Sequence, residues 1–126
     1  MSGKKLPPDP DRWTYIIRSL MSYRGFSSAE KLERYFEPRR LTRMAIRRII
    51  DRSDPELGTD EGDFKLGRLA GMLDLPPETL RLVYYGDAEA LSRLPFTRPG
   101  GDEIKQYLLD QLNGEDRPAA RLRRQA

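Results

Sequence analysis

The chain of 126 residues contains neither cysteine nor histidine. Without cysteine it forms no disulfide and offers no thiol nucleophile, and without both residues it lacks the usual ligands of zinc. Histidine is also the commonest general base of enzymes. No spacing of the remaining polar residues suggests a carboxylate metal site or a Ser–Lys pair. We therefore predict that the protein is not an enzyme and binds neither a metal nor a cofactor.

Long apolar runs are absent too, since 37% of the residues are hydrophobic while 34% are charged. No run approaches the roughly 20 residues that a membrane-spanning helix needs, and the N-terminus shows no signal-peptide pattern. These features predict a cytoplasmic protein that has no membrane partner. The length suits one domain, with part of the chain lying outside its core.

Basic residues are concentrated in one part of the chain. Residues 24–52 hold nine arginines and lysines against four acids, whereas residues 54–63 hold five acids and no base. A basic block of this kind is the electrostatic footprint expected of a face that binds nucleic acid. Because the net charge of the whole chain is only +3, the indication comes from how the charges are distributed.

The apolar residues recur at helical spacing, and we find no strand pattern and no internal repeat. The first predicted helix begins at a capping Asp11 and ends before Gly25, which suits the left-handed position that follows many helices. The second begins with a capping box at Ser27 and ends at Pro38. Three aromatic residues on the apolar faces of these helices are expected in the core: Trp13, Tyr35 and Phe36.

Further helices follow this pair. A third covers residues 41–51, and a polar, acidic loop at 53–62 separates it from a fourth, for which Asp63 is the expected cap. A fifth helix ends at Gly86, and a short turn follows it. The last predicted helix, residues 102–114, is amphipathic and comes after a linker that contains proline and glycine.

The segment from Arg39 to Arg52 carries the clearest functional pattern. Its apolar residues make one helical stripe, and Arg43, Arg47 and Arg48 point away from that stripe. The major groove of DNA admits an α-helix, and arginine can bond bidentately to O6 and N7 of guanine. The alternative is the solvated basic surface of an ordinary core helix, because charged runs are often only solvated.

Two motifs resemble the Cro/C1 (XRE-type) helix-turn-helix family of phage and bacterial repressors. Residues 41–49, LTRMAIRRI, are similar to the recognition helix of the family, and residues 66–80 resemble the passage that closes its domain. The resemblance covers roughly residues 12–91. The chain departs from the family in a longer turn before the third helix and in the absence of the glutamine that often begins the second. Its small size and arginine-rich composition resemble immunity repressors of actinobacterial phages.

The helical spacing and the lack of a strand pattern predict an all-α fold, and the resemblance specifies it as a five-helix Cro/C1-type domain followed by an additional C-terminal helix. We divide the chain into five parts. These are a flexible basic arm (1–10), the helix-turn-helix domain (11–94), a linker (95–101), the C-terminal amphipathic helix (102–114) and a disordered basic tail (115–126).

In this family the third helix enters the major groove, while the second crosses the DNA backbone. Carried onto this sequence, the base contacts would fall to Thr42, Arg43, Met44 and Arg47. The phosphate contacts would fall to Ser27, Ser28, Arg39, Arg40, Arg48, Arg52, Lys4, Lys5 and Arg12. Alternatives remain open for Met44 as a packing residue, for the two serines as plain caps and for the basic arm as a solubilising segment.

The resemblance thus implies a sequence-specific repressor that acts at the host nucleoid by occupying an operator in double-stranded DNA. Such operators are usually paired half-sites that a dimer reads. The helix at 102–114 can serve as the dimerisation element of a homodimer, or it can pack back on its own domain. The alternative function is an antitoxin-like or other protein-binding regulator, which uses the helix-turn-helix domain for autoregulation and masks a partner with its C-terminal segment.

Overall fold

The computed structural model describes residues 8–36 and 40–113, and every regular element within them is an α-helix. The predicted all-α class is therefore confirmed, and a short helix stands where a turn was expected after Gly86. Lys4, Lys5, Arg39 and the tail at 115–126 lie outside the described residues. The helices are α1 (Pro10–Tyr23), α2 (Ala29–Tyr35), α3 (Arg43–Ile50), α4 (Asp60–Met72), α5 (Thr79–Tyr85), α6 (Ala88–Arg93) and α7 (Gly101–Leu112).

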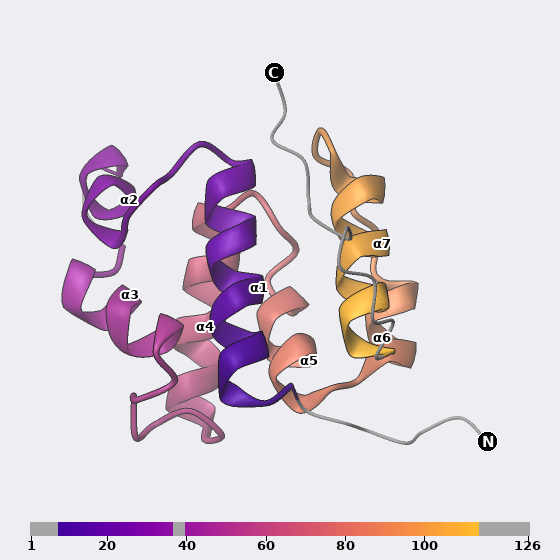
Figure 1. The fold of residues 1–126 in the computed structure, drawn as a ribbon, viewed down its shortest axis with the longest axis horizontal. Coiled ribbons are helices and arrows are strands. Elements are labelled where there is room, and N and C mark those ends of the chain that lie inside the picture. Colours follow the sequence, from indigo (N-terminus) through magenta and orange to yellow (C-terminus); the bar gives the residue numbers. More distant parts are fainter. Residues whose placement is uncertain (1–7, 37–39, 114–126) are drawn as a thin grey trace.

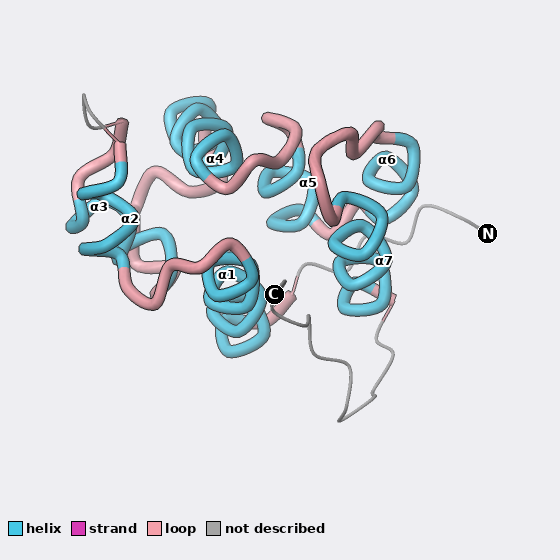
Figure 2. Tube along the Cα trace, turned by 90° about the horizontal axis from the view of Figure 1, so that it is seen from above, coloured by secondary structure: helices cyan, strands magenta, loops and turns pink. Residues whose placement is uncertain are grey.

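The helices lie side by side between the two ends of the molecule, and their order in space differs from their order in the chain. Figure 1 shows α2 and α3 together at one end, α1 and α4 beside them, and α6 and α7 at the other end. The view from above in Figure 2 shows the same order, with α5 between α4 and α6. The α2–α3 pair therefore lies at an extremity of the molecule, where one side of each helix is uncovered.

One hydrophobic core joins the helices from α1 to α7. Trp13 is fully buried, as predicted, and Phe36 is partly buried. Tyr35 was wrongly expected in the core, because its side chain is 70% exposed. The reason is that α2 turns Ala29 and Leu32 toward the core, and Tyr35 is the last residue of the helix. The largest fully buried side chains are Trp13, Ile16, Ile17, Leu20, Leu32, Ile46, Ile49, Leu66, Leu69, Leu73, Leu80 and Leu91.

The N-cap of the first helix lies two residues before the predicted one. Asp9, not Asp11, is the N-cap, and its carboxylate accepts a hydrogen bond of 2.8 Å from the amide of Arg12. Pro10 explains the difference, because its ring presets the backbone for the first helical position, where an N–H is not required. At the other end Gly25 has a φ of +93°, so the predicted left-handed position is confirmed.

The second helix is capped by Ser28 rather than by Ser27. The Ser28 hydroxyl accepts a hydrogen bond of 3.1 Å from the amide of Lys31. The predicted capping box does not form, since the carboxylate of Glu30 pairs with Arg43 of α3 instead of reaching back to the cap. A tertiary contact has therefore replaced the local one.

The fourth helix also begins earlier than expected, with Thr59 rather than Asp63 as its N-cap. Acidic residues in its first turn favour this start, because they interact with the positive end of the helix dipole. Gly62 is required here, since a Cβ at this position would lie 2.1 Å from the carbonyl oxygen of Glu56. The acidic loop is consequently shorter than predicted and lies against the helix that follows.

Asp54 in this loop is an acid that the core nearly covers, with 6% of its surface exposed. Its carboxylate accepts hydrogen bonds of 2.8 Å from Lys65 Nζ and from the amide of Glu56. The bond from Lys65 is the main cause that holds the pKa of Asp54 below its ordinary value. The pair joins the segment that follows α3 to α4.

The apolar stripe of α7 is buried within the chain. Ile104, Tyr107 and Leu108 are covered, and the helix packs on α1 and α6. Arg12 of α1 adds a hydrogen bond of 3.0 Å to the side-chain oxygen of Gln111. Of the two predicted arrangements, the helix therefore packs back on its own domain.

We expect the burial of Tyr107 to make stability fall at alkaline pH. Burial raises the pKa of its phenol from the ordinary value of 10 to about 12. Stability from the neutral phenol is fully present below pH 10 and is lost as the pH rises toward 12, because the unfolded chain ionises first. Between pH 9 and pH 11 this group should lower the unfolding free energy by about 1 kcal/mol.

Urea unfolding at both pH values, with Tyr107→Phe as the comparison, measures this contribution. Phenylalanine cannot ionise, so the variant should lose less stability between the two pH values than the parent chain. Other titrating groups act in both proteins and cancel in the difference. An equal loss in the two proteins would contradict the prediction.

Candidate nucleic-acid interface

The third helix is held at both of its ends by side chains. The carbonyl of Ile49 accepts a hydrogen bond of 2.7 Å from the indole N–H of Trp13, and that of Ile50 accepts one of 2.7 Å from the Thr14 hydroxyl. The bond to Ile50 satisfies a carbonyl that a helix C-terminus leaves unpaired, whereas the carbonyl of Ile49 also accepts a hydrogen bond from the amide of Arg52. At the N-terminus, the Thr42 hydroxyl accepts a hydrogen bond of 3.1 Å from the amide of Ala45. The position of α3 on α1 is therefore closely defined.

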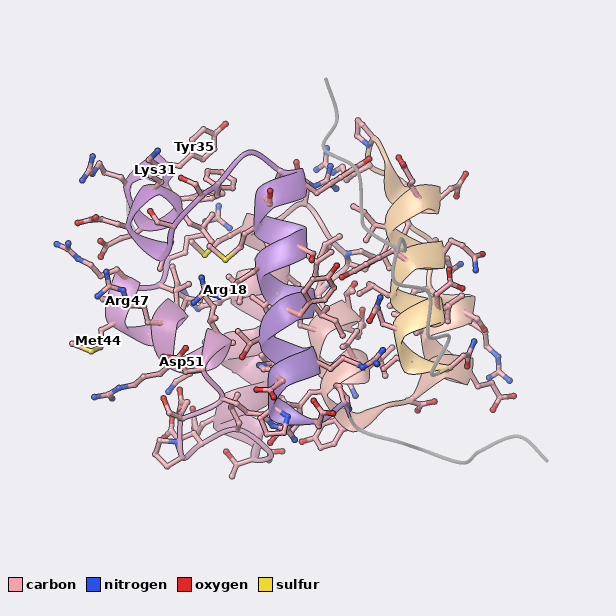
Figure 3. All side chains as sticks on the ribbon, in the orientation of Figure 1. Arg18, Lys31, Tyr35, Met44, Arg47 and Asp51 are labelled. Atoms are coloured by element: carbon pink, nitrogen blue, oxygen red, sulfur yellow. The ribbon has the colours of Figure 1, made fainter. Side chains whose placement is uncertain are left out.

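The side of α3 that faces away from α1 carries four exposed residues, which we call the arginine face: Arg43, Met44, Arg47 and Arg48. Its opposite side buries Ile46, Ile49 and Ile50, so the predicted division of this helix is confirmed. Met44 is 58% exposed and does not serve as a core residue. Figure 3 shows Met44 and Arg47 on α3 at the end of the molecule, with Lys31 and Tyr35 further up on α2.

A groove of about 390 Å³ lies beside the arginine face, where α1, the start of α2 and α3 meet. Arg18 of α1 and Arg47 of α3 line it together with Ser27 and Ser28. Figure 3 shows Arg18 beside Arg47, between α1 and α3. Arg18 was not predicted as a site residue, because it lies outside the basic block and only the packing of α1 on α3 brings it here.

Arg43 is placed differently from the other arginines of the face. Its Nη1 lies 2.5 Å from Glu30 Oε2, and its Nε lies 3.5 Å from Glu33 Oε1. Both carboxylates belong to α2. Arg47, four residues further along α3, forms no ion pair with any acid in the described part of the chain.

Two of the predicted phosphate-contacting arginines are engaged within the domain. Arg12 bonds to Gln111 of α7, as described above. Arg52 has a φ of +60°, and its guanidinium bonds to the carbonyl of Pro8 and lies over the ring of Tyr84, 4.8 Å from the centroid. The left-handed backbone after α3 turns this side chain back onto the domain. Arg40 is exposed, with its guanidinium over the ring of Phe36.

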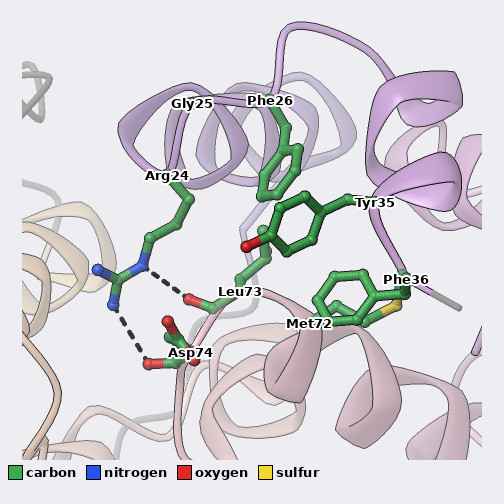
Figure 4. Close-up of a pocket in the computed structure, with 8 residues that line it drawn as sticks. All are labelled: Arg24, Gly25, Phe26, Tyr35, Phe36, Met72, Leu73 and Asp74. Carbon is green, nitrogen blue, oxygen red and sulfur yellow. Dashed lines mark hydrogen bonds between the residues drawn. The ribbon is translucent and has the colours of Figure 1, made fainter.

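A second hollow, of about 500 Å³, opens on the aromatic side of α2 (Figure 4). Its three rings meet edge to face, with centroids 5.2 Å apart for Phe26 and Tyr35 and 5.1 Å apart for Tyr35 and Phe36. The guanidinium of Arg24 is occupied by the carbonyls of Leu73, Asp74 and Pro99. We call this hollow the aromatic pocket, and its lining combines the three rings with the polar residues Arg24 and Asp74.

Among the residues that the structure describes, no three acidic side chains converge as metal ligands would. No helix in these ranges is long and apolar enough to cross a membrane. The arginine face and its groove are therefore the feature on which an assignment of function depends. Comparisons of the chain with models of known protein families, with curated proteins and with solved structures found no match.

Proposed function

We propose that this protein is a sequence-specific DNA-binding repressor, and that α3 enters the major groove of its operator. The observation that carries the proposal is the arginine face, an outward row on a helix that Trp13, Thr14 and Thr42 hold in place. The face lies at an extremity of the molecule, so a duplex can approach it without displacing another helix (Figure 1). A helix held in this way can present arginines to base edges in a constant register.

In this proposal α2 and α3 are the two helices of a Cro/C1-type helix-turn-helix, and the later helices support them. Arg47 and Arg43 donate to guanine, and Met44 contacts a thymine methyl group. Thr42, at the N-terminus of α3, is exposed and lies at the edge of the same face. Its hydroxyl oxygen accepts the capping bond, and its O–H remains able to donate to a base.

Phosphate contacts in this proposal come from the arginine face and from residues around it. Arg48 of the face is exposed, and so is Arg40, which precedes α3. Arg18 and the serines at 27–28 line the groove next to Arg47. Such contacts set the position of the protein on the duplex without reading its sequence. Repression then follows from occupation of an operator that overlaps a promoter in the host cytoplasm.

A second candidate function is a protein-binding regulator of the antitoxin type. The apolar stripe of α7 is buried and is not available to a partner. The observation that favours this function is instead the aromatic pocket, with Tyr35 70% exposed at its edge. Exposed tyrosine and arginine are typical of residues that dominate protein interfaces. A stoichiometric partner that co-purifies with the chain and is lost in Tyr35→Ser would favour this function over DNA binding.

Selection of bound duplexes from a random-sequence DNA pool tests the leading proposal. We expect a sharp consensus, because several side chains of α3 face outward in one register. The number of repeats in the consensus would report how many copies bind, and the affinity should fall steeply with salt. Retention without a consensus would indicate a non-specific binder, and no enrichment at all would refute the proposal.

A further inference from the structure

We infer that Glu30 and Glu33 of α2 are specificity-determining residues, because they hold Arg43 for base reading and weaken its attraction to phosphates. The inference rests on the proposed function and assigns a role to two acids within the DNA-binding unit. Neither acid would contact the bases, since their part is to position the guanidinium of Arg43. They are thus positioning residues of the recognition helix.

Two acids fix the orientation of the Arg43 guanidinium. Glu30 pairs with Nη1 and Glu33 pairs with Nε, so two different nitrogens of the same group are held. The side chain of Glu33 is only 15% exposed, which makes it a fixed support, whereas Arg43 is 52% exposed and reaches the surface. Nη2 lies outside both pairs and remains available to donate to a base.

This arrangement changes what the arginine contributes to binding. A free arginine loses its rotamer freedom when it binds a base, whereas an arginine that is already held loses less of it. The two neighbouring carboxylates also offset its positive charge, and attraction to phosphates depends on that charge. Arg43 should therefore add more to the preference for the correct sequence than to the general affinity for DNA.

A contribution to folding stability does not explain the ion pairs of Arg43 with the two acids. Ion pairs between exposed side chains contribute little to folding, and Glu30 and Arg43 are both well exposed at the surface. Glu30 also lies 4.0 Å from Arg34, the other basic group on its own helix that faces it.

The test compares Glu30→Gln, Glu33→Gln and the double variant with the parent chain. Dissociation constants are measured for the selected duplex and for a scrambled duplex over a series of salt concentrations. We expect the double variant to bind the scrambled duplex more tightly and to lose about tenfold in the ratio of the two affinities. The dependence of log K on log salt for the scrambled duplex should steepen by about one, as for one added phosphate contact.

A matched control is Glu89→Gln, which removes the same charge from an acid that pairs with Arg93 on α6. This pair lies at the end of the molecule remote from α3 (Figure 1), so the affinity ratio should stay as in the parent. In an Arg43→Ala background the Glu33→Gln substitution should no longer change the ratio, because no guanidinium is left to position.

Three results would overturn the inference, and they can be told apart. If the parent chain selects no duplex, the proposed function fails and the inference fails with it. If the parent binds its selected duplex but the double variant keeps the same affinity ratio and salt dependence, only the inference fails. An equal change in the Glu89→Gln control would likewise overturn it, because net charge alone would then explain the effect.

Discussion

Trp13→Ala is expected to lower the free energy of unfolding by about 3–5 kcal/mol, the largest effect that we predict for a single side chain. Trp13 is fully buried, and its ring meets that of Tyr84 edge to face with centroids 5.4 Å apart. Its indole N–H also bonds to the carbonyl of Ile49. One side chain of α1 thereby contacts both α3 and α5, and its truncation leaves a cavity between three helices.

The size of this loss has a consequence for function. Domains of ordinary size are stable by only about 5–15 kcal/mol, so the variant should lose a large share of its stability. Trp13→Phe keeps most of the ring but removes the indole donor from the carbonyl of Ile49, which still accepts a hydrogen bond from the amide of Arg52, so the cost should be about 0.5–1.5 kcal/mol. We expect this second variant to stay folded and to bind DNA more weakly, since the end of α3 is less firmly held.

Urea unfolding of the parent and both variants, followed by circular dichroism, measures these losses. Thr14→Val is the control, because it removes the adjacent bond to Ile50 without leaving a large cavity and should cost about 1 kcal/mol. A loss of less than about 1 kcal/mol for Trp13→Ala would contradict the placement of Trp13 between α1, α3 and α5.

Arg47→Ala is expected to raise the dissociation constant for the selected duplex by about 5- to 150-fold, as for the loss of one bidentate contact to guanine. Arg47 lies on the arginine face, beside the groove that it lines with Arg18. It forms no ion pair with an acid of the described residues, so its donors are available to a base. The variant should lose its sequence preference at only one base pair of the duplex.

Arg48→Ala should behave differently. A side chain that contacts phosphate weakens binding to all sequences alike when it is removed, and it lowers the salt slope by about one. Arg98→Ala is the control, because this exposed arginine lies between α6 and α7 at the far end of the molecule. All three variants should unfold as the parent does, since surface substitutions usually change stability by less than about 0.5 kcal/mol.

The readout is the dissociation constant of each variant for the selected duplex and for duplexes with single base changes. If Arg47→Ala and Arg48→Ala weakened every duplex equally, the assignment of Arg47 to a base edge would be wrong. If neither variant differed from the Arg98→Ala control, the arginine face itself would not be the DNA-binding surface.

Much of the helical architecture could be predicted without coordinates, because helix formation depends on spacing that can be read locally. The apolar stripes of α1 and α3 and the left-handed Gly25 are examples. The caps were less predictable, and those of α1, α2 and α4 each differ from the predicted residue. Several polar residues near a helix start compete for the same backbone amides, and proline or a distant partner decides between them.

Part of the candidate site could likewise be predicted from the sequence, and part could not. That Arg43, Met44, Arg47 and Arg48 face outward follows from their positions relative to the buried isoleucines. Arg18 could not be found in this way, because it belongs to the site only through the packing of α1 on α3. The ion pairs of Arg43 with Glu30 and Glu33 also connect two helices whose relative placement is not written in either helix alone.

The sequence by itself determined the all-helical class and the outward row of arginines on α3, because both depend on periodicity within one segment. Only the tertiary structure decided which cations remain available. It engages Arg12 with α7 and Arg52 with the domain, buries the stripe of α7 and sets two acids against Arg43. The physical reason is that a charge acts through the groups that surround it, and residues distant in the chain supply those groups.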